Sequence, residues 1–467
     1  MERQNYDVII VGAGPAGIFA ALEILKHKPD ARMLILEKGR LVERRICPKR
    51  QHKECVNCNP CSITSGWGGA GAFSDGKLSL SSDVGGQIAD YVGEDEAARL
   101  IKYVDDIYLS YGGKSQVFYD EEFSDEIARK SAIYGLKLIK CPVRHLGTED
   151  SAQIMDKIYG AIKAHPGVDI MTSTSAQSLE LDDDRLVGIK ITIKDEERLF
   201  TAPHVIMAVG REGADWLNLE SRRLGLKVTN NAIDIGVRVE VPRAITDYLT
   251  DRLYEFKYIY YSDIFENKVR TFCVNPGGFV SQENYDDGLA LVNGHSYSNL
   301  KSENTNFALL VSSKFTQPFN DPIAYGKSIA KLGNMLTGGK VMVQRLFDLD
   351  QGRRTTNSRL AKMAMQPTLK HAVPGDLSYV LPHRHLTSIV EALKALDNMC
   401  PGMYGKNTLL YGVEAKFYSS KLDVDTNMET AVKGLYAIGD GAGITRGLIQ
   451  ASITGVVAGR SIAGAAE

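Results

Sequence analysis

Short apolar runs alternate with stretches of helical periodicity at both ends of the chain. Such runs are typical of buried parallel strands, and apolar side chains spaced about three to four residues apart indicate helices that pack on them. The strands and helices expected there cover residues 7–11, 15–28, 33–36, 434–438 and 444–465. This order predicts an α/β fold to which both ends of the chain contribute.

Between the two ends the pattern changes twice. Strand-like runs separated by turn residues predict a β-meander, and a mixed pattern follows it. The meander strands are expected at 168–175, 177–181, 186–194 and 204–209. Helices are expected at 94–110, 151–164, 322–337 and 386–399, and further strands at 234–240, 254–261, 269–274 and 307–312.

These patterns divide the chain into segments. Residues 1–80, 151–225 and 415–467 are expected to build one α/β domain, residues 81–150 a helical insert, and residues 226–414 an inserted mixed α+β domain. A chain of 467 residues has room for roughly two to three domains, so this division is consistent with its length.

Composition argues against nucleic-acid-binding and membrane proteins but does not identify a function. The net charge is −2, which gives no electrostatic reason to expect nucleic acid or an anionic membrane as a partner. No apolar run approaches the roughly 18 residues of a membrane span, and the first residues show no signal-peptide pattern. We therefore expect a cytoplasmic protein; the sequence sets no oligomeric state.

The first turn carries a dinucleotide-binding pattern. Residues Gly12 to Gly17 follow G-x-G-x-x-G between a predicted strand and a predicted helix, and Glu37 ends the next strand. The first glycine allows a tight turn, the second lets the backbone approach a pyrophosphate, and the third lets helix and strand pack closely. The helix N-terminus then favours the phosphates, and the carboxylate is placed to accept from ribose hydroxyls.

The other end of the chain repeats a strand that closes on glycine and an acid, Gly434-Leu-Tyr-Ala-Ile-Gly439-Asp440-Gly441, and residues 203–211 form a further strand that ends in small residues. With these three ordered motifs the sequence resembles the glutathione-reductase-like superfamily of FAD-binding proteins. The resemblance implies a Rossmann-type FAD-binding domain, with Asp440 at the ribityl chain of FAD. The final helix is expected to direct its N-terminus toward the flavin, where positive potential stabilises an anionic reduced ring, with Arg446 adding to it or pairing on the surface.

A second glycine-rich segment, residues 64–78, holds five glycines and two alanines in 15 residues. A loop with so little side-chain bulk lets a large group approach its backbone. It resembles the loop that proteins of the succinate-dehydrogenase type place against the isoalloxazine ring. The residues expected to bind FAD are Gly12, Gly14, Pro15, Ala16, Gly17, Glu37, Lys38, Gly68, Gly69, Ala70, Lys77, Ala176, Ala208, Gly210, Gly439, Asp440, Gly441, Ile444, Arg446, Gly447 and Leu448.

Four of the seven cysteines crowd just before that loop, at Cys47, Cys55, Cys58 and Cys61. Their spacing is compatible with an iron–sulfur cluster or zinc held by thiolates. Free thiols, a disulfide or a redox-active pair near the flavin are open alternatives.

The one other G-x-G-x-x-G, Gly66 to Gly71, lies inside the irregular glycine-rich segment and not between a predicted strand and a predicted helix. The chain is therefore expected to lack a separate NAD(P)H domain of that type, and residues 226–414 are expected to form a cap, with the substrate bound between it and the flavin. Paired guanidiniums at Arg353-Arg354 suit a substrate carboxylate, and histidines titrate near neutrality. The candidate catalytic residues are Arg354, His383, His385, Lys416 and His295.

Most of the chain also resembles a family of poorly characterised bacterial and archaeal FAD-dependent dehydrogenases. The resemblance is carried by residues 55–63, 69–78 and 442–448. It implies a flavin oxidoreductase and brings no established substrate. The leading hypothesis is an FAD-dependent dehydrogenase or reductase that transfers hydride between the flavin and a small, anionic organic molecule. The alternatives are an enoate-type reductase with NAD(P)H as co-substrate, an electron-transfer flavoprotein that passes electrons from a cysteine-ligated cluster to a redox partner protein, and a flavin-binding module without turnover.

Overall fold

The computed structural model describes residues 5–48, 56, 58–74, 76–183, 185–193, 196–284, 288–297 and 300–465. The chain divides into two compact units: unit 1 comprises Met1–Val117, Pro142–Asn231 and Ser419–Glu467, and unit 2 comprises Phe118–Cys141 and Ala232–Tyr418. The segment 81–150, expected as a separate helical insert, is instead shared between them. The reason is that its strand β5 (Leu136–Leu138) pairs with the sheet of unit 2.

Unit 1 is built on a five-stranded sheet in which every neighbouring pair is parallel. Its strands, in spatial order, are β23 (Leu435–Ala437), β11 (His204–Met207), β1 (Val8–Val11), β2 (Met33–Glu37) and β7 (Val168–Thr172). The first and last segments of the chain therefore share one sheet, as their apolar runs predicted.

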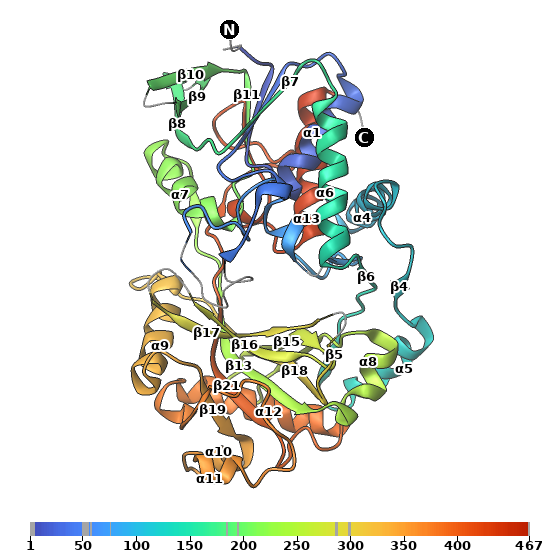
Figure 1. The fold of residues 1–467 in the computed structure, drawn as a ribbon, viewed down its shortest axis with the longest axis vertical. Helices are drawn as coiled ribbons and strands as arrows, with labels where there is room; N and C mark the ends of the chain where they lie inside the picture. Colours follow the sequence, from blue (N-terminus) through green and yellow to red (C-terminus); the bar gives the residue numbers. More distant parts are fainter. Residues whose placement is uncertain are drawn as a thin grey trace. The chain divides into compact units, whose positions relative to one another are not determined.

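Helices cover this sheet. Figure 1 shows α1 (Pro15–His27), α6 (Thr148–Lys163) and α13 (Leu448–Ala463) side by side. Gly455 permits the close packing of α13 on α1, because a Cβ there would lie 2.1 Å from the Ala16 carbonyl oxygen. The expected start of the last helix at Ile444 was wrong. Gly443 has a left-handed backbone, with φ of 72°, and the helix begins only after Gly447.

The meander has three strands, β8 (Ala176–Asp182), β9 (Arg185–Ile193) and β10 (Glu196–Thr201), paired antiparallel. Two of the four strands expected in it, 168–175 and 204–209, lie in the parallel sheet instead, as β7 and β11. The pattern located the strands but not their partners, since an apolar run fits either sheet.

The shorter elements of unit 1 connect these layers. They are η1 (Val42–Arg44), η2 (Gly69–Phe73), β3 (Lys77–Ser79), α3 (Ala89–Val92), α4 (Glu94–Ser110), β6 (Val143–His145), η3 (Arg211–Gly213), α7 (Ala214–Arg223), β12 (Val228–Thr229), β22 (Lys421–Leu422) and η6 (Asp440–Ala442), with β4 (Val117–Phe118) at the boundary between the units.

Unit 2 contains an eight-stranded sheet. Its spatial order is β20 (Val373–Pro374), β19 (Met342–Arg345), β21 (Leu409–Lys416), β13 (Ile233–Pro242), β18 (Asn304–Ser313), β15 (Lys268–Asn275), β14 (Tyr258–Tyr261) and β5. All neighbours are antiparallel except β19 and β20. A hairpin and helices complete the unit: β16 (Phe279–Asn284), β17 (Ala290–His295), α5 (Glu121–Ala132), η4 (Arg243–Ile245), α8 (Asp247–Leu253), α9 (Pro322–Thr337), α10 (Leu346–Asp350), α11 (Asn357–Leu360), η5 (Leu377–Tyr379) and α12 (His383–Met399).

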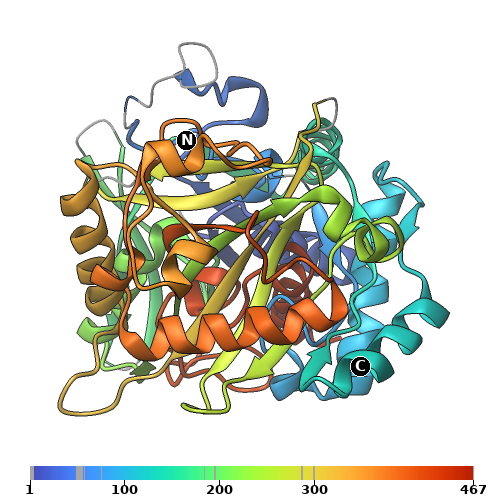
Figure 2. The same cartoon turned by 90° about the horizontal axis from the view of Figure 1, so that it is seen from below.

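The central strand β13 alternates apolar and polar residues, yet nearly all of it is buried. Its apolar side chains, from Ile233 to Val241, join one core cluster with α12, which lies across the strands in Figure 2. The side chains of Asp234, Arg238 and Glu240 point to the other face. A buried polar face requires hydrogen-bond partners for every member, so this face is built as a network.

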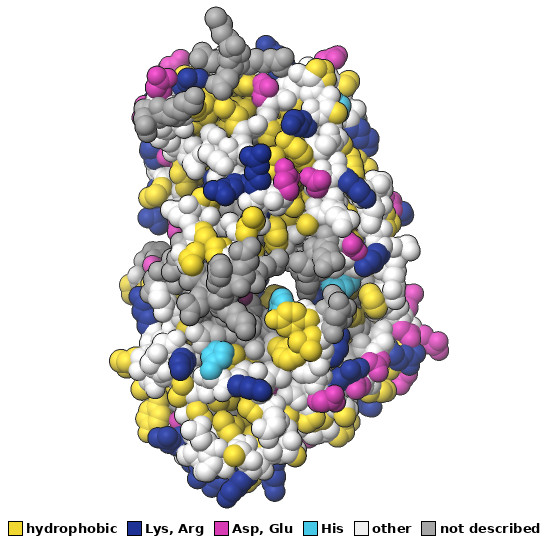
Figure 3. Space-filling view, viewed as in Figure 1, with side chains coloured by type: hydrophobic (Ala, Val, Ile, Leu, Met, Phe, Trp, Pro, Cys, Tyr) yellow, Lys and Arg dark blue, Asp and Glu magenta, His cyan; other side chains and the backbone are white. Residues whose placement is uncertain are grey.

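The surface carries charges of both signs. On the face drawn in Figure 3, Lys and Arg side chains are interspersed with Asp and Glu. Within the described ranges, no helix combines the length and the apolar content that a membrane crossing requires.

Candidate functional site

Two positions at the junction of β1 and α1 require glycine. A Cβ on Gly12, whose φ is +105°, would lie 2.3 Å from the Ala208 carbonyl oxygen, and one on Gly17 would lie 2.1 Å from the Gly12 carbonyl oxygen. The turn thus fits tightly between α1 and the end of β11. It leaves the first N–H groups of α1, at Ala16 and Gly17, at the carboxyl edge of the parallel sheet, where an anion is favoured.

The second glycine-rich segment lies directly against this turn. The Gly68 N–H donates to the Ala13 carbonyl at 2.8 Å, and a Cβ on Gly69 would come within 3.0 Å of the Gly14 Cα. Trp67 anchors the segment to α6, because its indole N–H donates to the Met155 carbonyl at 2.9 Å. Two stretches of nearly bare backbone therefore meet at this turn.

Arg45 holds the second segment in shape, and sequence reasoning missed it. The side chain is buried, and burial lowers its pKa to about 10, so it stays charged at neutral pH. Its guanidinium donates to four backbone carbonyls of the loop, those of Ser62, Ile63, Trp67 and Gly69. Its partners are backbone carbonyls in an irregular loop, and no sequence pattern predicts such hydrogen bonds.

Glu37 is the carboxylate that joins the two glycine segments. Its Oε2 accepts from the Ala13 N–H at 2.9 Å, and its Oε1 accepts from the N–H groups of Gly39 and Gly66 at 2.8 and 2.9 Å. A carboxylate has about four lone-pair sites, so it keeps capacity for a ligand hydroxyl. The expected contact between Glu37 and a ribose stays a prediction.

A cavity of about 190 Å³ opens beside Glu37, at the carboxyl ends of β2 and β7. The Thr174 N–H donates to the Glu37 carbonyl at 3.0 Å, which ties the two strand ends together. Ligands of open α/β sheets bind at this edge. The cavity is lined by Arg40, Leu41, Arg44, Thr172 and Ser173, none of which the sequence singled out.

Asp440 begins η6 at the far end of the same sheet edge. Burial raises its pKa, against the opposing effects of Arg211, whose Nε is 3.8 Å from Oδ2, and of Thr445, whose hydroxyl donates to Oδ1 at 2.8 Å. Gly441 packs against Gly210, since a Cβ on Gly441 would be 2.6 Å from the Gly210 carbonyl oxygen. The acid is thus held at the sheet edge by neighbouring loops.

The remaining predicted cofactor residues vary in placement. Ile444 is buried in the core, Arg446 is exposed, and the Arg446 backbone N–H donates to the Gly85 carbonyl at 2.7 Å. Lys38 Nζ donates to the Glu212 carbonyl at 3.2 Å. The others take ordinary positions in their elements: Pro15 opens α1, Gly439 precedes η6, Gly447 caps α13, Leu448 begins it, Ala70 lies exposed in η2, Lys77 begins β3 and Ala176 begins β8.

Of the four clustered cysteines, Cys55 lies outside the described residues. Cys47 and Cys61 are half-buried, Cys58 is exposed, and none of these three forms a disulfide in the described part of the chain. Across those same residues, no group of three or more Cys, His, Asp and Glu side chains is arranged to hold a metal. An iron–sulfur cluster or zinc at the four cysteines remains a prediction.

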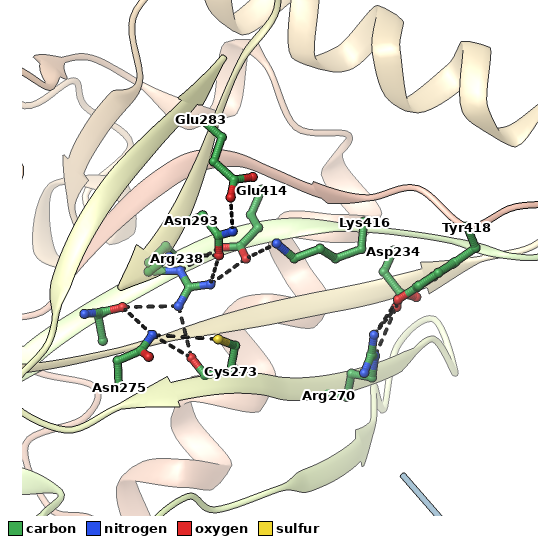
Figure 4. A network of polar contacts seen from close by, with 12 residues as sticks. Asp234, Arg238, Arg270, Cys273, Asn275, Glu283, Asn293, Glu414, Lys416 and Tyr418 are labelled. Atoms are coloured by element: carbon green, nitrogen blue, oxygen red, sulfur yellow. Dashed lines mark hydrogen bonds and ion pairs between the residues drawn. The ribbon is translucent and has the colours of Figure 1, made fainter. Parts of the chain in front are cut away.

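Of the candidate catalytic residues, Lys416 alone belongs to the polar face of the unit 2 sheet, drawn in Figure 4. Its Nζ lies 3.1 Å from Glu414 Oε1. Glu414 also receives two hydrogen bonds from Arg238, at 2.8 and 2.6 Å, and both of these side chains are fully buried. Arg238 further donates to Asn293, Asn306 and the Cys273 carbonyl.

A second ion pair lies on the same face (Figure 4). Arg270 donates to Asp234 Oδ2 through Nε at 3.0 Å and Nη2 at 2.6 Å, and the Tyr418 hydroxyl donates to the same oxygen at 2.6 Å. Burial opposes ionisation of Asp234, but Arg270 and the hydroxyls of Ser312 and Tyr418 bring its pKa below the ordinary value. The sequence did not mark this pair, because the two residues are 36 positions apart.

The other candidates do not join Lys416. His385 is buried in α12, with Nε2 3.1 Å from the Ser313 hydroxyl, and burial lowers its pKa to about 4. His383 is exposed at the start of α12, and His295 is exposed on β17, where its ring stacks edge-on to Tyr297. Arg354 is exposed in the loop after α10, whereas its neighbour Arg353 pairs with the buried Asp348 at 3.0 Å. The ion pair between Arg353 and Asp348 therefore stabilises the loop itself.

Comparison with known proteins places these features in a class. Residues 232–417 match the family model described as FAD-dependent protein, C-terminal domain-like. This match supports FAD as the cofactor and an FAD-dependent oxidoreductase as the class of enzyme, as expected from the sequence. An uncharacterized protein of Clostridium beijerinckii is 25% identical, in an alignment that covers 96% of this chain and 79% of that protein.

Among solved structures, 3-ketosteroid-Δ4-(5α)-dehydrogenase of Rhodococcus jostii is 14% identical with a TM-score of 0.47, covering 99% of this chain and 98% of that chain. Formate oxidase of Aspergillus oryzae is 12% identical with a TM-score of 0.45, covering 100% and 99%. Quinol fumarate reductase of E. coli is 13% identical with a TM-score of 0.41, covering 100% and 71%. These similarities assign no substrate to this chain.

Proposed function

We propose that this protein is an FAD-dependent dehydrogenase or reductase that transfers hydride between the flavin and a small, anionic organic substrate. The observation that carries the proposal is the cradle of unit 1, in which two glycine segments meet at the carboxyl edge of a parallel sheet and Glu37 bonds to both. A bare backbone at a helix N-terminus, next to a carboxylate, fits the pyrophosphate and ribose of a dinucleotide.

The residues present fit FAD in order along that edge. The N–H groups at the start of α1 would take the pyrophosphate, Glu37 the adenosine ribose, and the cavity beside it the adenine. Asp440 would meet the ribityl chain, as the family resemblance implies, and residues 66–72 would lie against the ring. FAD supplies the hydride chemistry, and the chain supplies binding, orientation and protons.

The test is anaerobic reduction of the bound flavin. Purified protein should contain FAD, released by heat or acid. At least one compound of a carboxylate-rich metabolite library should bleach the visible absorbance of the oxidised flavin. Bleaching by NADH or NADPH would identify the co-substrate of the reductase variant. If FAD is present but neither nicotinamide nor any metabolite bleaches it, the protein is a flavin-binding module and the enzymatic proposal fails.

A further inference from the structure

Two cationic side chains of unit 2 approach one aromatic ring from different strands. Lys416 Nζ on β21 lies 5.9 Å from the centre of the Phe272 ring, and the guanidinium carbon of Arg270 on β15 lies 4.8 Å from it. Phe272 itself is partly exposed. Cations near the face of an aromatic ring mark a surface where charge and apolar contact adjoin.

The acidic partners of these cations lie deeper than the cations. The side chains of Lys416 and Arg270 are 18% and 21% exposed, whereas those of Glu414 and Asp234 are 0% and 3% exposed. Each buried carboxylate therefore holds its cation from below and fixes its direction. In each pair the cation is the more exposed member.

Both cations also keep donors to spare. Within the described part of the chain, the Lys416 ammonium meets one carboxylate, Glu414, and the Arg270 contacts use Nε and Nη2 but not Nη1. An ammonium has three N–H groups and a guanidinium five, so each side chain can bind a further acceptor. Glu283 joins this network through the Asn293 amide, which donates to it at 2.5 Å, and among the described residues it forms no ion pair with either cation.

We propose that Lys416 and Arg270 bind the carboxylate of an organic acid, whose flat, apolar body rests on Phe272. The inference rests on the proposed oxidoreductase function and names its substrate class as an aromatic or unsaturated monocarboxylate. One negative charge suits the site better than a doubly charged phosphate, because each cation is already shared with a buried acid. Arg238 is a positioning residue, since it holds Glu414, which in turn directs Lys416.

The experiment measures benzoate binding to the full-length holoprotein by titration calorimetry, with benzamide as the uncharged analogue and inorganic phosphate as the competing anion. We expect benzoate to bind with a Kd of about 1 mM or tighter, and benzamide and phosphate to bind at least about tenfold more weakly. Benzamide or phosphate binding as tightly as benzoate would overturn the proposal, and so would no benzoate binding.

The informative variant is Lys416→Gln, because Glu414 keeps its two bonds from Arg238 and the buried carboxylate therefore stays paired. It should weaken benzoate binding about tenfold or more, whereas Lys331→Gln, at an exposed position on α9, should leave it unchanged. Unchanged binding in Lys416→Gln would sink the assignment. Should that variant fail to fold, Phe272→Leu tests the role of the ring. Benzoate binding should weaken while acetate binding does not, and an equal effect on both would contradict the contact with Phe272.

The same preparations separate this inference from the proposed function. Their FAD content and anaerobic bleaching are read beside the calorimetry. FAD retained and bleached without any benzoate site rejects the carboxylate assignment alone. A benzoate site in a protein that holds no FAD rejects the proposed function.

Discussion

At the scale of single residues, burial decides what a candidate side chain can do. His385 is predicted from the sequence as a proton-transfer residue, because histidine titrates near neutrality. In the structure it is 1% exposed, and its Nδ1 has no hydrogen-bond partner in the described part of the chain. It is therefore neutral at physiological pH and belongs to the packing of α12.

This placement predicts a pH dependence of stability. The folded pKa of His385, about 4, lies below its ordinary value of 6.5, so its contribution to stability is present above pH 6.5 and is lost as the pH falls toward 4. Between pH 7 and pH 5 the wild type should lose about 2 kcal/mol of unfolding free energy that His385→Leu does not lose. Urea unfolding at both pH values measures it, with the exposed His371→Gln as control. Parallel losses in wild type and His385→Leu would refute the assignment.

The acids and bases of the candidate site differ in how far sequence could predict them. Glu37 follows from its place at the end of the second strand, which fixes its position relative to the glycine turn. Arg45 and Arg270 do not, because their partners are carbonyls of a folded loop and an acid on a non-neighbouring strand. Local sequence patterns predict where a strand ends and which residue stands there. Contacts between side chains that are distant in sequence become apparent only in the folded structure.

At the scale of elements, the sequence placed most strands and helices but not their partners. The runs that became β7 and β11 carry no signal that separates a meander from a parallel sheet. The same holds for residues 254–257, expected as strand: Tyr254 has a left-handed backbone with φ of 60° just after α8, and the strand begins at Tyr258. Pairing depends on chain segments far away in sequence, which periodicity does not report.

The glycine-rich loop forms part of the proposed FAD site, and Arg45 stabilises its conformation through hydrogen bonds to its carbonyls. Arg45→Met would leave four buried or part-buried carbonyls without their donor. We expect about 1–3 kcal/mol lower stability, faster amide hydrogen exchange in residues 62–73 and reduced FAD content. Hydrogen exchange with mass spectrometry checks this, with Arg99→Met, whose side chain is 76% exposed, as the matched control. Wild-type exchange and full FAD content in Arg45→Met would show that the loop stands without it.

At the scale of the whole molecule, the two units present different kinds of groups to a ligand. Unit 1 presents backbone: two glycine segments and a helix N-terminus, which the sequence predicted from spacing. Unit 2 presents a buried polar sheet face, visible in sequence only as the alternation of β13, whose polar members found partners on four other strands. The cofactor could therefore be inferred from the sequence, whereas the face proposed to bind the substrate became apparent only in the folded structure.

Binding of FAD by the glycine cradle of unit 1 can be tested by the FAD stoichiometry of a pair of glycine variants. A Cβ on Gly17 would lie 2.1 Å from the Gly12 carbonyl oxygen, whereas a Cβ on Gly160, in α6, meets nothing within 4 Å. Both residues lie in helices, so Gly17→Ala and Gly160→Ala share their effect on helix propensity and differ at the cradle. We expect about one FAD per chain in wild type and Gly160→Ala, and at least about a tenfold weaker FAD affinity in folded Gly17→Ala. Equal FAD content and affinity in the two variants would contradict it.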